Sequence, residues 1–320
     1  MRLLFVMDPI DSIRIDRDST YALMLEAQDR GHEVLYCLVT DLALLHGVPW
    51  ATARPCRVGT VQGEHAVLGP PSEVNLRTLD AIFMRKDPPF DMEYIFSTYL
   101  LEAAEPQALV VNRAGNLRNH NEKLYALQFP EFCPRSLVTS SARRIRDFME
   151  ELGVPIVVKP LDGNGGEGIF QVRREDPNRN VILEQSTRHG RRPVLAQRYL
   201  PEARLGDKRI LLVDGHFAGA VLRVPGGDDP RGNIHVGAVV HKTTLTEREQ
   251  ALLAQLGPRL RADGHLFVGI DVIGEHLTEV NVTSPTGIHE AYALDGVRVQ
   301  AMVLDAVEAH VTERRARAPA

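Results

Sequence analysis

A glycine-rich loop between two short apolar segments limits the possible folds of this chain more than any other stretch. Residues 156–160 are apolar apart from Lys159, glycine occupies four of the six positions from Gly163 to Gly168, and β-forming residues return at 169–172. The loop has the spacing G-x-G-x-x-G, which in dinucleotide-binding proteins opens a helix that holds a pyrophosphate. Because β-formers follow the loop here, the pattern favours a strand, a glycine loop and a second strand.

A glycine loop between two strands is the geometry of a flap that covers nucleotide phosphates. Glycines let backbone N–H groups approach phosphate oxygens without a Cβ in the way, and Lys159 supplies a point charge. The alternative is an ordinary glycine hairpin with no ligand. The motif alone leaves both interpretations open.

A second hairpin, predicted over 267–282, carries carboxylates. If Gly274, Glu275 and His276 form a three-residue turn, Asp271 lies opposite Glu279, with Asn281 two residues further on the same face. The other face is predicted to be a core face made by Val268, Ile270, Val272, Thr278, Val280 and Val282. Two facing carboxylates repel unless a positive group lies between them, and oxygen ligands suit Mg²⁺ shared with phosphates. The alternative is a solvated edge hairpin.

The first part of the chain has a β-α-β pattern. Strands are predicted at 3–7 and 33–39, with a helix capped by Ser19 between them and ending before Gly31. After a Pro/Gly-rich passage at 48–71, further strands at 81–84 and 109–112 flank a helix at 91–105. A helix within 112–129 precedes Pro130, a predicted domain boundary. The pattern predicts a parallel, doubly wound unit.

The second part mixes hairpins and helices, which favours an α+β arrangement. Helices are predicted at 143–152, 181–189, 246–262 and 298–313, with a strand at 194–200. A hairpin over 208–224 turns at Asp214-Gly215. Thr246 and Glu249 form a capping box at the start of the 246–262 helix.

Composition excludes several classes of protein. The 320 residues are 44% hydrophobic and 25% charged with a net charge of −5, so no overall basic field points to nucleic acid or an anionic membrane. Three widely spaced cysteines exclude a disulfide framework, and the short apolar opening predicts a cytoplasmic protein. No G-x-S-x-G or G-x-x-x-x-G-K-[ST] occurs, which removes the main support for a serine hydrolase or a P-loop enzyme.

Single basic residues stand in apolar or turn contexts at Lys123, Arg209, Arg223 and Arg231. Each alone is typical of a surface residue, but they occur together with a phosphate loop and a carboxylate pair. Arg85 follows a first-domain strand, where ligands of open α/β sheets bind, so it is placed to receive a substrate carboxylate.

The assembled motifs resemble the bacterial-type glutathione synthetases of the ATP-grasp superfamily. The resemblance covers nearly the whole chain and is specific, because several long motifs occur in the family's order. They are V-M-D-P-I, F-M-R-K-D-P-P-F-D, N-E-K-L, V-K-P-L-D-G-N-G-G-E-G-I-F, D-K-R-I-L-L-V-D-G, R-G-N, F-V-G-I-D-V-I-G and E-V-N-V-T-S-P-T-G-I.

The resemblance implies an α/β protein with an N-terminal Rossmann-like, pre-ATP-grasp domain followed by a two-subdomain α+β ATP-grasp fold. The implied boundaries are 1–120 and 121–316, with a glycine-loop subdomain at about 130–200 and a metal-binding subdomain at about 201–316. The family also implies homodimers or homotetramers.

The same resemblance implies a role for each candidate residue. The implied ATP contacts are Lys123, Lys159, Gly163, Gly165, Gly166, Gly168, Gln197, Tyr199, Leu200 and Asp207. The implied metal ligands are Asp271, Glu279 and Asn281, and the implied catalytic arginines are Arg209, Arg223 and Arg231. Arg85 and Ser284 are implied to bind substrate carboxylates.

The implied reaction joins γ-glutamylcysteine to glycine with ATP and Mg²⁺ or Mn²⁺, through an acyl phosphate. This chemistry needs charge neutralisation and positioning more than a nucleophilic side chain, which agrees with the absence of any Ser/His or Cys/His dyad. The chain departs from the family after Arg231-Gly232-Asn233 and at His289, both on the acceptor side. Two rival hypotheses are an ATP-grasp ligase with a different amine acceptor or γ-glutamyl substrate and a nucleotide-binding regulator without catalysis.

Overall fold

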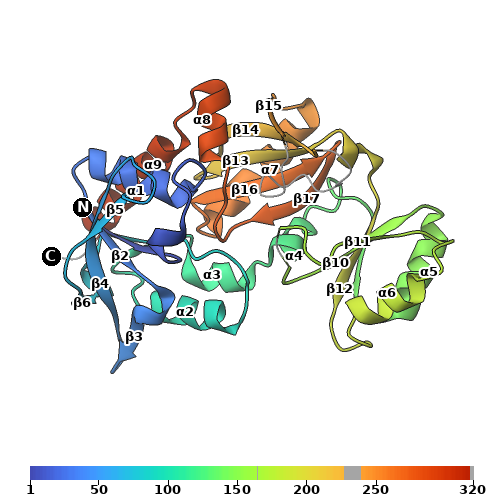
Figure 1. Ribbon diagram of the computed structural model, residues 1–320, viewed down its shortest axis with the longest axis horizontal. Helices are drawn as coiled ribbons and strands as arrows, with labels where there is room; N and C mark the ends of the chain where they lie inside the picture. The colour runs from blue at the N-terminus through green and yellow to red at the C-terminus, as the bar shows by residue number, and fades with distance from the viewer. Residues whose placement is uncertain (164, 227–238, 318–320) are drawn as a thin grey trace.

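The computed structural model describes residues 1–163, 165–226 and 239–317. Its strands form three sheets, which follow one another along the chain (Figure 1). The first sheet uses strands from residues 2–111, the second from 136–198 and the third from 207–281. The chain therefore has the α/β character that its sequence predicts.

The first sheet contains four parallel strands in the order β2, β1, β7 and β8. The side chains from Leu3 to Val6 are fully buried, because a strand in the middle of a parallel sheet is covered on both faces. The elements of this region are β1 (Arg2–Val6), η1 (Ile10–Ser12), α1 (Ser19–Asp29), β2 (Glu33–Cys37), η2 (Val39–Asp41), β3 (Leu42–Leu45), β4 (Val48–Val58), β5 (Ala66–Leu68), β6 (Ser72–Asn75), η3 (Leu76–Thr78), β7 (Ala81–Met84), α2 (Met92–Glu102) and β8 (Leu109–Val111).

The passage 48–71, which shows only Pro and Gly enrichment in the sequence, contains the long strand β4 and the short strand β5. β4 pairs antiparallel with β2, β3, β5 and β6, so it extends the parallel sheet at one edge. Small buried residues, Ala51 and Ala53, alternate with more exposed ones along it. Two prolines inside the strand hide this alternation from sequence analysis, because proline is rare in strand interiors.

The second sheet is small and antiparallel, in the order β11-β10-β12-β9. Two helices, α5 and α6, contact it. Gly153 follows α5 with a φ of 66°, as the predicted C-terminal stop requires. The elements are β9 (Ser136–Thr139), α5 (Ala142–Leu152), β10 (Ile156–Pro160), β11 (Phe170–Val172), α6 (Arg179–Ser186) and β12 (Val194–Arg198).

The third sheet is antiparallel, in the order β15-β14-β13-β16-β17. The predicted hairpin turn at Asp214-Gly215 is confirmed by the pairing of Val213 with His216, and the Thr246 and Glu249 capping box is confirmed as well. The elements are η4 (Pro201–Arg204), β13 (Asp207–Val213), β14 (His216–Val224), β15 (Val239–Lys242), α7 (Glu247–Ala262), β16 (Phe267–Ile273), β17 (His276–Asn281), α8 (Ile288–Asp295) and α9 (Val299–Arg317).

Two helix predictions differ in detail from the structure. Asp18, not Ser19, caps α1, because its carboxylate accepts a hydrogen bond from the Tyr21 N–H at 2.7 Å. The single helix predicted within 112–129 is two short helices, α3 (Ala114–Asn119) and α4 (Glu122–Ala126). Asn121 separates them and caps α4 through its side-chain oxygen.

The hydrophobic core is divided unevenly among the sheets. Side chains from the first and third sheets pack into the same two clusters, for example Leu4 with Ile270 and Phe5 with Leu211. The second sheet has a separate and smaller cluster, which includes Ile145 and Val158. The first and third sheets therefore share one packed body, while the second sheet is stabilised by its own core. None of the helices that the structure describes is long and apolar enough to span a membrane.

A close backbone contact joins the β13–β14 turn to α7. A Cβ added to Gly257 would lie 2.2 Å from the Gly215 carbonyl oxygen. Alanine in a helix is normally about 1 kcal/mol better than glycine. We expect Gly257→Ala to reverse that sign and to lower the free energy of unfolding by about 2 kcal/mol, because the backbone must move apart.

Chemical denaturation of the two proteins measures this difference. Gln255→Ala, at an exposed position of the same helix, is the matched control and should change stability by less than about 0.5 kcal/mol. A Gly257→Ala protein as stable as the wild type would contradict the close packing of this turn.

Candidate active site

The glycine loop connects two antiparallel strands. β10 pairs with β11 so that Ile156 lies opposite Val172, and no helix follows Gly168 directly. The dinucleotide-binding interpretation is therefore wrong for this loop. Gly165, Gly166 and Gly168 have φ values of 61°, 83° and 69°, a backbone region that side chains rarely adopt.

Asn121 and Lys123, at the start of helix α4, form hydrogen bonds with the backbone of the glycine loop. The Asn121 amide donates a hydrogen bond to the Leu161 carbonyl at 2.8 Å, and Lys123 Nζ donates to the Gly163 carbonyl at 2.8 Å. In Figure 1, α4 lies between the second and third sheets. The helix is thus the structural link through which the loop reaches the third sheet.

The carboxylate hairpin has the predicted pairing but a different turn. β16 and β17 are joined by a two-residue turn, and a bulge after Asp271 restores the pairing of Asp271 with Glu279. Because of the bulge, Leu277 and not Thr278 belongs to the core face. The Thr278 hydroxyl instead donates to the Asp271 carbonyl at 3.1 Å.

The two hairpins meet at Glu279. Its Oε1 lies 3.9 Å from Lys159 Nζ, on the strand before the glycine loop, and 3.7 Å from Lys123 Nζ on α4. Both lysines are largely buried, whereas the Glu279 side chain is 22% exposed. Two buried ammonium groups beside a glycine loop form a site suited to phosphate oxygens.

Asp271 is the centre of a buried ion-pair cluster. Arg209 binds both carboxylate oxygens, at 2.6 and 3.0 Å, and Arg223 binds one at 2.8 Å. Asn281 donates to the second oxygen at 3.0 Å. Burial alone would raise the pKa of Asp271, but the two guanidinium groups hold it well below its usual range.

Asp207 lies beside this cluster, and its pKa is shifted in the opposite direction from that of Asp271. Its Oδ2 accepts from Arg223 at 2.5 Å, and its other carboxylate oxygen is buried without a hydrogen-bond partner among the described residues. Burial raises the pKa of Asp207 to about 6, and the Asp271 charge adds to this against the opposing effect of Arg223. The two acids therefore share one set of cations, and Asp207 is the one that takes up a proton first.

Asp207→Asn tests this assignment through the pH dependence of stability. A carboxyl group whose pKa is higher in the folded than in the unfolded protein stabilises the fold as pH falls through the folded value. From pH 7 to pH 5 we expect the wild type to gain on the order of 1 kcal/mol relative to the variant. Denaturation curves at both pH values measure it, and a constant difference would contradict the assignment.

The side-chain oxygens on the third sheet suit a divalent cation that is also bound by ligands from outside the protein. Glu279 and Asn281 supply oxygens, and no described side chain donates a hydrogen bond closely to the Glu279 carboxylate. Within the described ranges, no three His, Cys, Asp or Glu side chains form a cluster that could hold a metal by themselves. Phosphate oxygens and water would therefore have to complete the coordination of a divalent cation.

The predicted substrate residues lie where the first and third sheets meet. Arg85 is 5% exposed and donates to the Thr20 hydroxyl and to the Pro285 carbonyl, both at 3.0 Å. Within the described residues Arg85 forms no salt bridge, although the charges of Asp87 and Asp18 lie near enough to oppose the effect of burial on its pKa. The Ser284 hydroxyl lies 3.4 Å from the Arg85 carbonyl. Burial lowers the pKa of Arg85, so an acid group brought next to it would be bound strongly.

The remaining predicted ATP contacts lie on or after β12. Gln197 pairs with Val157 of β10, and its side chain donates to the Ser136 hydroxyl at 3.0 Å. The Tyr199 N–H donates to the Pro155 carbonyl at 3.0 Å, and Leu200 is 5% exposed. Gln197 is therefore on the strand beside the one that carries Lys159, and Tyr199 and Leu200 come directly after that strand. Arg231 lies outside the described residues.

Glu122 is a residue that sequence analysis missed. Its carboxylate accepts a hydrogen bond from the Thr283 hydroxyl at 2.8 Å, and burial together with the nearby Glu279 charge raises its pKa. The motif N-E-K-L contains it next to Lys123, but the sequence shows no sign that the first turn of so short a helix is buried. Glu122 therefore belongs to the charge balance of the site.

The comparison with known families covers both parts of the chain. Residues 1–118 match the N-terminal domain family of prokaryotic glutathione synthetases, and residues 122–296 match their ATP-grasp domain family. The glutathione synthetase of Brucella melitensis biotype 1 is 44% identical over 309 residues, covering 97% of this chain and 99% of that protein. The glutathione synthetase of a Synechocystis species is 47% identical over 314 residues, covering 95% and 98%.

Solved structures with the same fold are much more distant in sequence. A RimK domain protein of the ATP-grasp type from Sphaerobacter thermophilus has a TM-score of 0.61 at 20% identity, over 96% of this chain and 100% of that one. An ATP-grasp ligase from Chryseobacterium gregarium has a TM-score of 0.65 at 14% identity, over 97% of both chains. At these identities the likeness establishes the fold alone.

Proposed function

The chain belongs to the prokaryotic glutathione synthetase family, and from this membership we propose where and how its residues carry out the ATP-dependent ligation. It is an ADP-forming ligase that makes glutathione from γ-glutamylcysteine and glycine. We propose that the reaction takes place where Lys159 and Glu279 lie 3.9 Å apart. This one distance carries the proposal, because it brings the phosphate loop and the carboxylate hairpin to the same point.

The ATP phosphates are proposed to bind between the glycine loop and the third sheet. Lys123 and Lys159 neutralise phosphate charge, and the backbone N–H groups of Gly163, Gly165, Gly166 and Gly168 cover the phosphates. Lys123 then exchanges its present contact with the Gly163 carbonyl for a phosphate oxygen. Gln197, Tyr199 and Leu200 are proposed to line the adenine, with Asp207 towards the ribose.

The chemistry proceeds in two balanced steps. A cysteinyl carboxylate oxygen of the dipeptide attacks the γ-phosphorus, the bond to ADP breaks, and an acyl phosphate forms. The glycine amine then attacks the acyl carbon, phosphate leaves, and the nitrogen releases a proton. Arg209 and Arg223 lower the energy of both steps by lying beside the developing negative charge, and Arg231 is proposed to help.

Asp271, Glu279 and Asn281 are proposed to hold the divalent cation, Mg²⁺ or Mn²⁺. When bound, the cation neutralises phosphate charge during phosphoryl transfer. Arg209 and Arg223 keep Asp271 ionised and fix the orientation of its carboxylate. Glu279 has weaker contacts and can turn towards a cation without breaking a short hydrogen bond.

Arg85 and the Ser284 turn are proposed to bind substrate carboxylate groups. Among the described residues the buried Arg85 guanidinium donates to a hydroxyl and a carbonyl and has no ion-pair partner, so a substrate acid could bind it at the junction of two domains. Nearby, His289 contacts the Asp18 carbonyl at 3.0 Å, so it is engaged with the first domain.

The organisation of the molecule follows from the same family membership. We propose the domain limits 1–120 and 121–316, with subdomains at about 130–200 and 201–316. We further propose a homodimer or homotetramer that works in the cytoplasm on small molecules, with no nucleic-acid or membrane partner.

Measurement of ADP release with γ-glutamylcysteine, with and without glycine, tests the acceptor. We expect ADP release to need glycine, and expect alanine or serine in its place to support much slower release. Equal release with another small amine would favour a ligase of different acceptor specificity. Absence of ADP with any peptide would favour the regulator hypothesis.

A further inference from the structure

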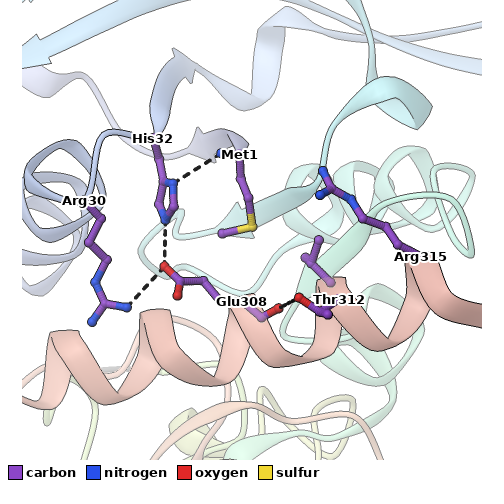
Figure 2. Close-up of a pocket in the computed structure, with 7 residues that line it drawn as sticks. Met1, Arg30, His32, Glu308, Thr312 and Arg315 are labelled. Carbon is purple, nitrogen blue, oxygen red and sulfur yellow. Dashed lines mark hydrogen bonds and ion pairs between the residues drawn. The ribbon is translucent and has the colours of Figure 1, made fainter.

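Two cavities lie away from the proposed active site, and the charged groups that line the first already have partners. It has a volume of about 600 Å³ beside α9 (Figure 2). His32 contacts the Met1 nitrogen at 3.3 Å and Glu308 at 2.8 Å, and Arg30 contacts Glu308 at 3.2 Å. These charged groups are already paired, so the first cavity offers no unpaired charge that would bind a ligand.

The second cavity is lined by four distant parts of the chain. It has a volume of about 480 Å³ and lies among residues 102–113 around β8, the β13–β14 turn at Asp214, residues 261–266 at the end of α7, and the last turns of α9. Pro106, Leu109 and Leu266 make part of its lining apolar. A space of this size with a mixed apolar and charged lining matches the usual form of a small-molecule site.

Two arginines of this cavity lie near one acid, Glu105, and Arg113 is the one within ion-pair distance of it. Arg113 Nε lies 3.7 Å from Glu105, and Arg314 donates to the Pro106 and Ala108 carbonyls at 2.7 Å. Burial raises the pKa of Glu105. Burial lowers the pKa of Arg314, and the nearby Arg113 charge lowers it further. Two guanidinium groups therefore face one carboxylate whose ionisation is itself opposed by burial.

A second part of the lining, around Asp214, is also short of negative charge. Asp214 is shared by Arg261 at 3.9 Å and by His310 at 3.2 Å. The third acid of the lining, Glu102, is held outside this group by Arg118 at 2.5 Å. Counted without Glu102 and with neutral histidines, three arginines face two carboxylates.

A buried nitrogen adds an independent observation. His265 lines the cavity and is 1% exposed, and its Nδ1 has no hydrogen-bond partner among the described residues. Its other ring nitrogen is already shared with His120 Nδ1 at 2.7 Å. An unpaired buried polar atom is costly, and a polar group entering the cavity could satisfy it.

We propose that this cavity is a second binding site, for a small organic oxyanion that carries an apolar body. The planar guanidinium groups fit a carboxylate or a phosphate ester, and the apolar lining fits the rest of the ligand. The proposal does not depend on the ligase reaction or its substrates, because none of these lining residues belongs to the proposed active site.

Equilibrium binding to the full-length protein, with ATP and Mg²⁺ at saturation, tests the proposal. The probes are benzoate and phenyl phosphate, and benzamide is the neutral analogue of the same shape. We expect at least one anion to bind, with benzamide weaker by about tenfold or more. Arg113→Gln should weaken the anion about fivefold, because a partly exposed charge contributes about 1 kcal/mol.

Arg143→Gln, on the exposed face of α5, is the matched control and should bind the anion as the wild type does. Arg261→Gln provides a second variant if Arg113→Gln lowers the thermal midpoint of unfolding, and should also weaken the anion. Failure of both anions to bind would overturn the proposal. So would equal binding of benzamide, competition by ATP, or the same loss of affinity in Arg143→Gln.

Discussion

Glu279→Gln is expected to keep its fold and to lose at least about a hundredfold in the rate of ADP formation. The amide has the same shape but no charge, so the point where Lys123 and Lys159 converge loses its anion. Stability should change by less than about 1 kcal/mol, because the side chain is partly exposed and its ion pairs are long. A coupled ADP assay and a thermal melt measure the two effects.

The matched control for this substitution is Glu275→Gln, at the exposed turn of the same hairpin, which should retain wild-type turnover. The pair of variants separates a loss of local charge from any disturbance of the hairpin. Wild-type turnover in Glu279→Gln would refute the assignment of Glu279 to the metal and phosphate site.

Arg209→Gln is expected to lower both activity and stability. Removal of the guanidinium leaves Asp271 buried with Arg223 and Asn281 alone, and breaking a buried ion pair costs about 3 kcal/mol. Because the pKa of Asp271 is lowered on folding, this contribution is present above the unfolded value near 4 and is lost only below it. The stability deficit should therefore persist from pH 5 to pH 8.

Turnover of the same variant should fall by about a hundredfold or more, because the group beside the transferring phosphoryl charge is missing. Arg209→Lys separates the two roles: it keeps the charge but cannot bind both oxygens of Asp271, so its losses should lie between those of the wild type and Arg209→Gln. A fully active Arg209→Gln protein would exclude Arg209 from the catalytic group.

Sequence analysis was most successful where local pattern decides structure. The glycine hairpin, the hairpin turn at Asp214-Gly215 and the Thr246 cap depend on neighbouring residues, and each is present as predicted. The pairing of Asp271 with Glu279 was also predicted correctly, although for a turn of the wrong length. The alternation of core and outward-facing side chains along the two strands limits the possible registers. The bulge after Asp271 compensates for the shorter turn and restores the predicted pairing.

Features that depend on contacts between distant segments were not predictable. One sequence cannot show that the half-buried Glu122 accepts a hydrogen bond from Thr283, or that Arg85 donates to the Pro285 carbonyl 200 residues away. The same holds for β4, which lies in the Pro/Gly-rich passage where no strand was predicted, since its place in the sheet depends on its pairing with β2 and β6. Tertiary context decided each of these cases.

The separate core of the second sheet has a consequence for how the protein opens. Only a few side chains, among them Ile156, Leu183 and Val194, stabilise this unit, whereas the other two sheets share far larger clusters. Amide protons of β10 and β12 should therefore exchange with solvent through a partial unfolding that leaves β1 and β13 protected. Lys159 belongs to the second sheet. A nucleotide bound between the second and third sheets should therefore slow the exchange of the second-sheet amide protons selectively.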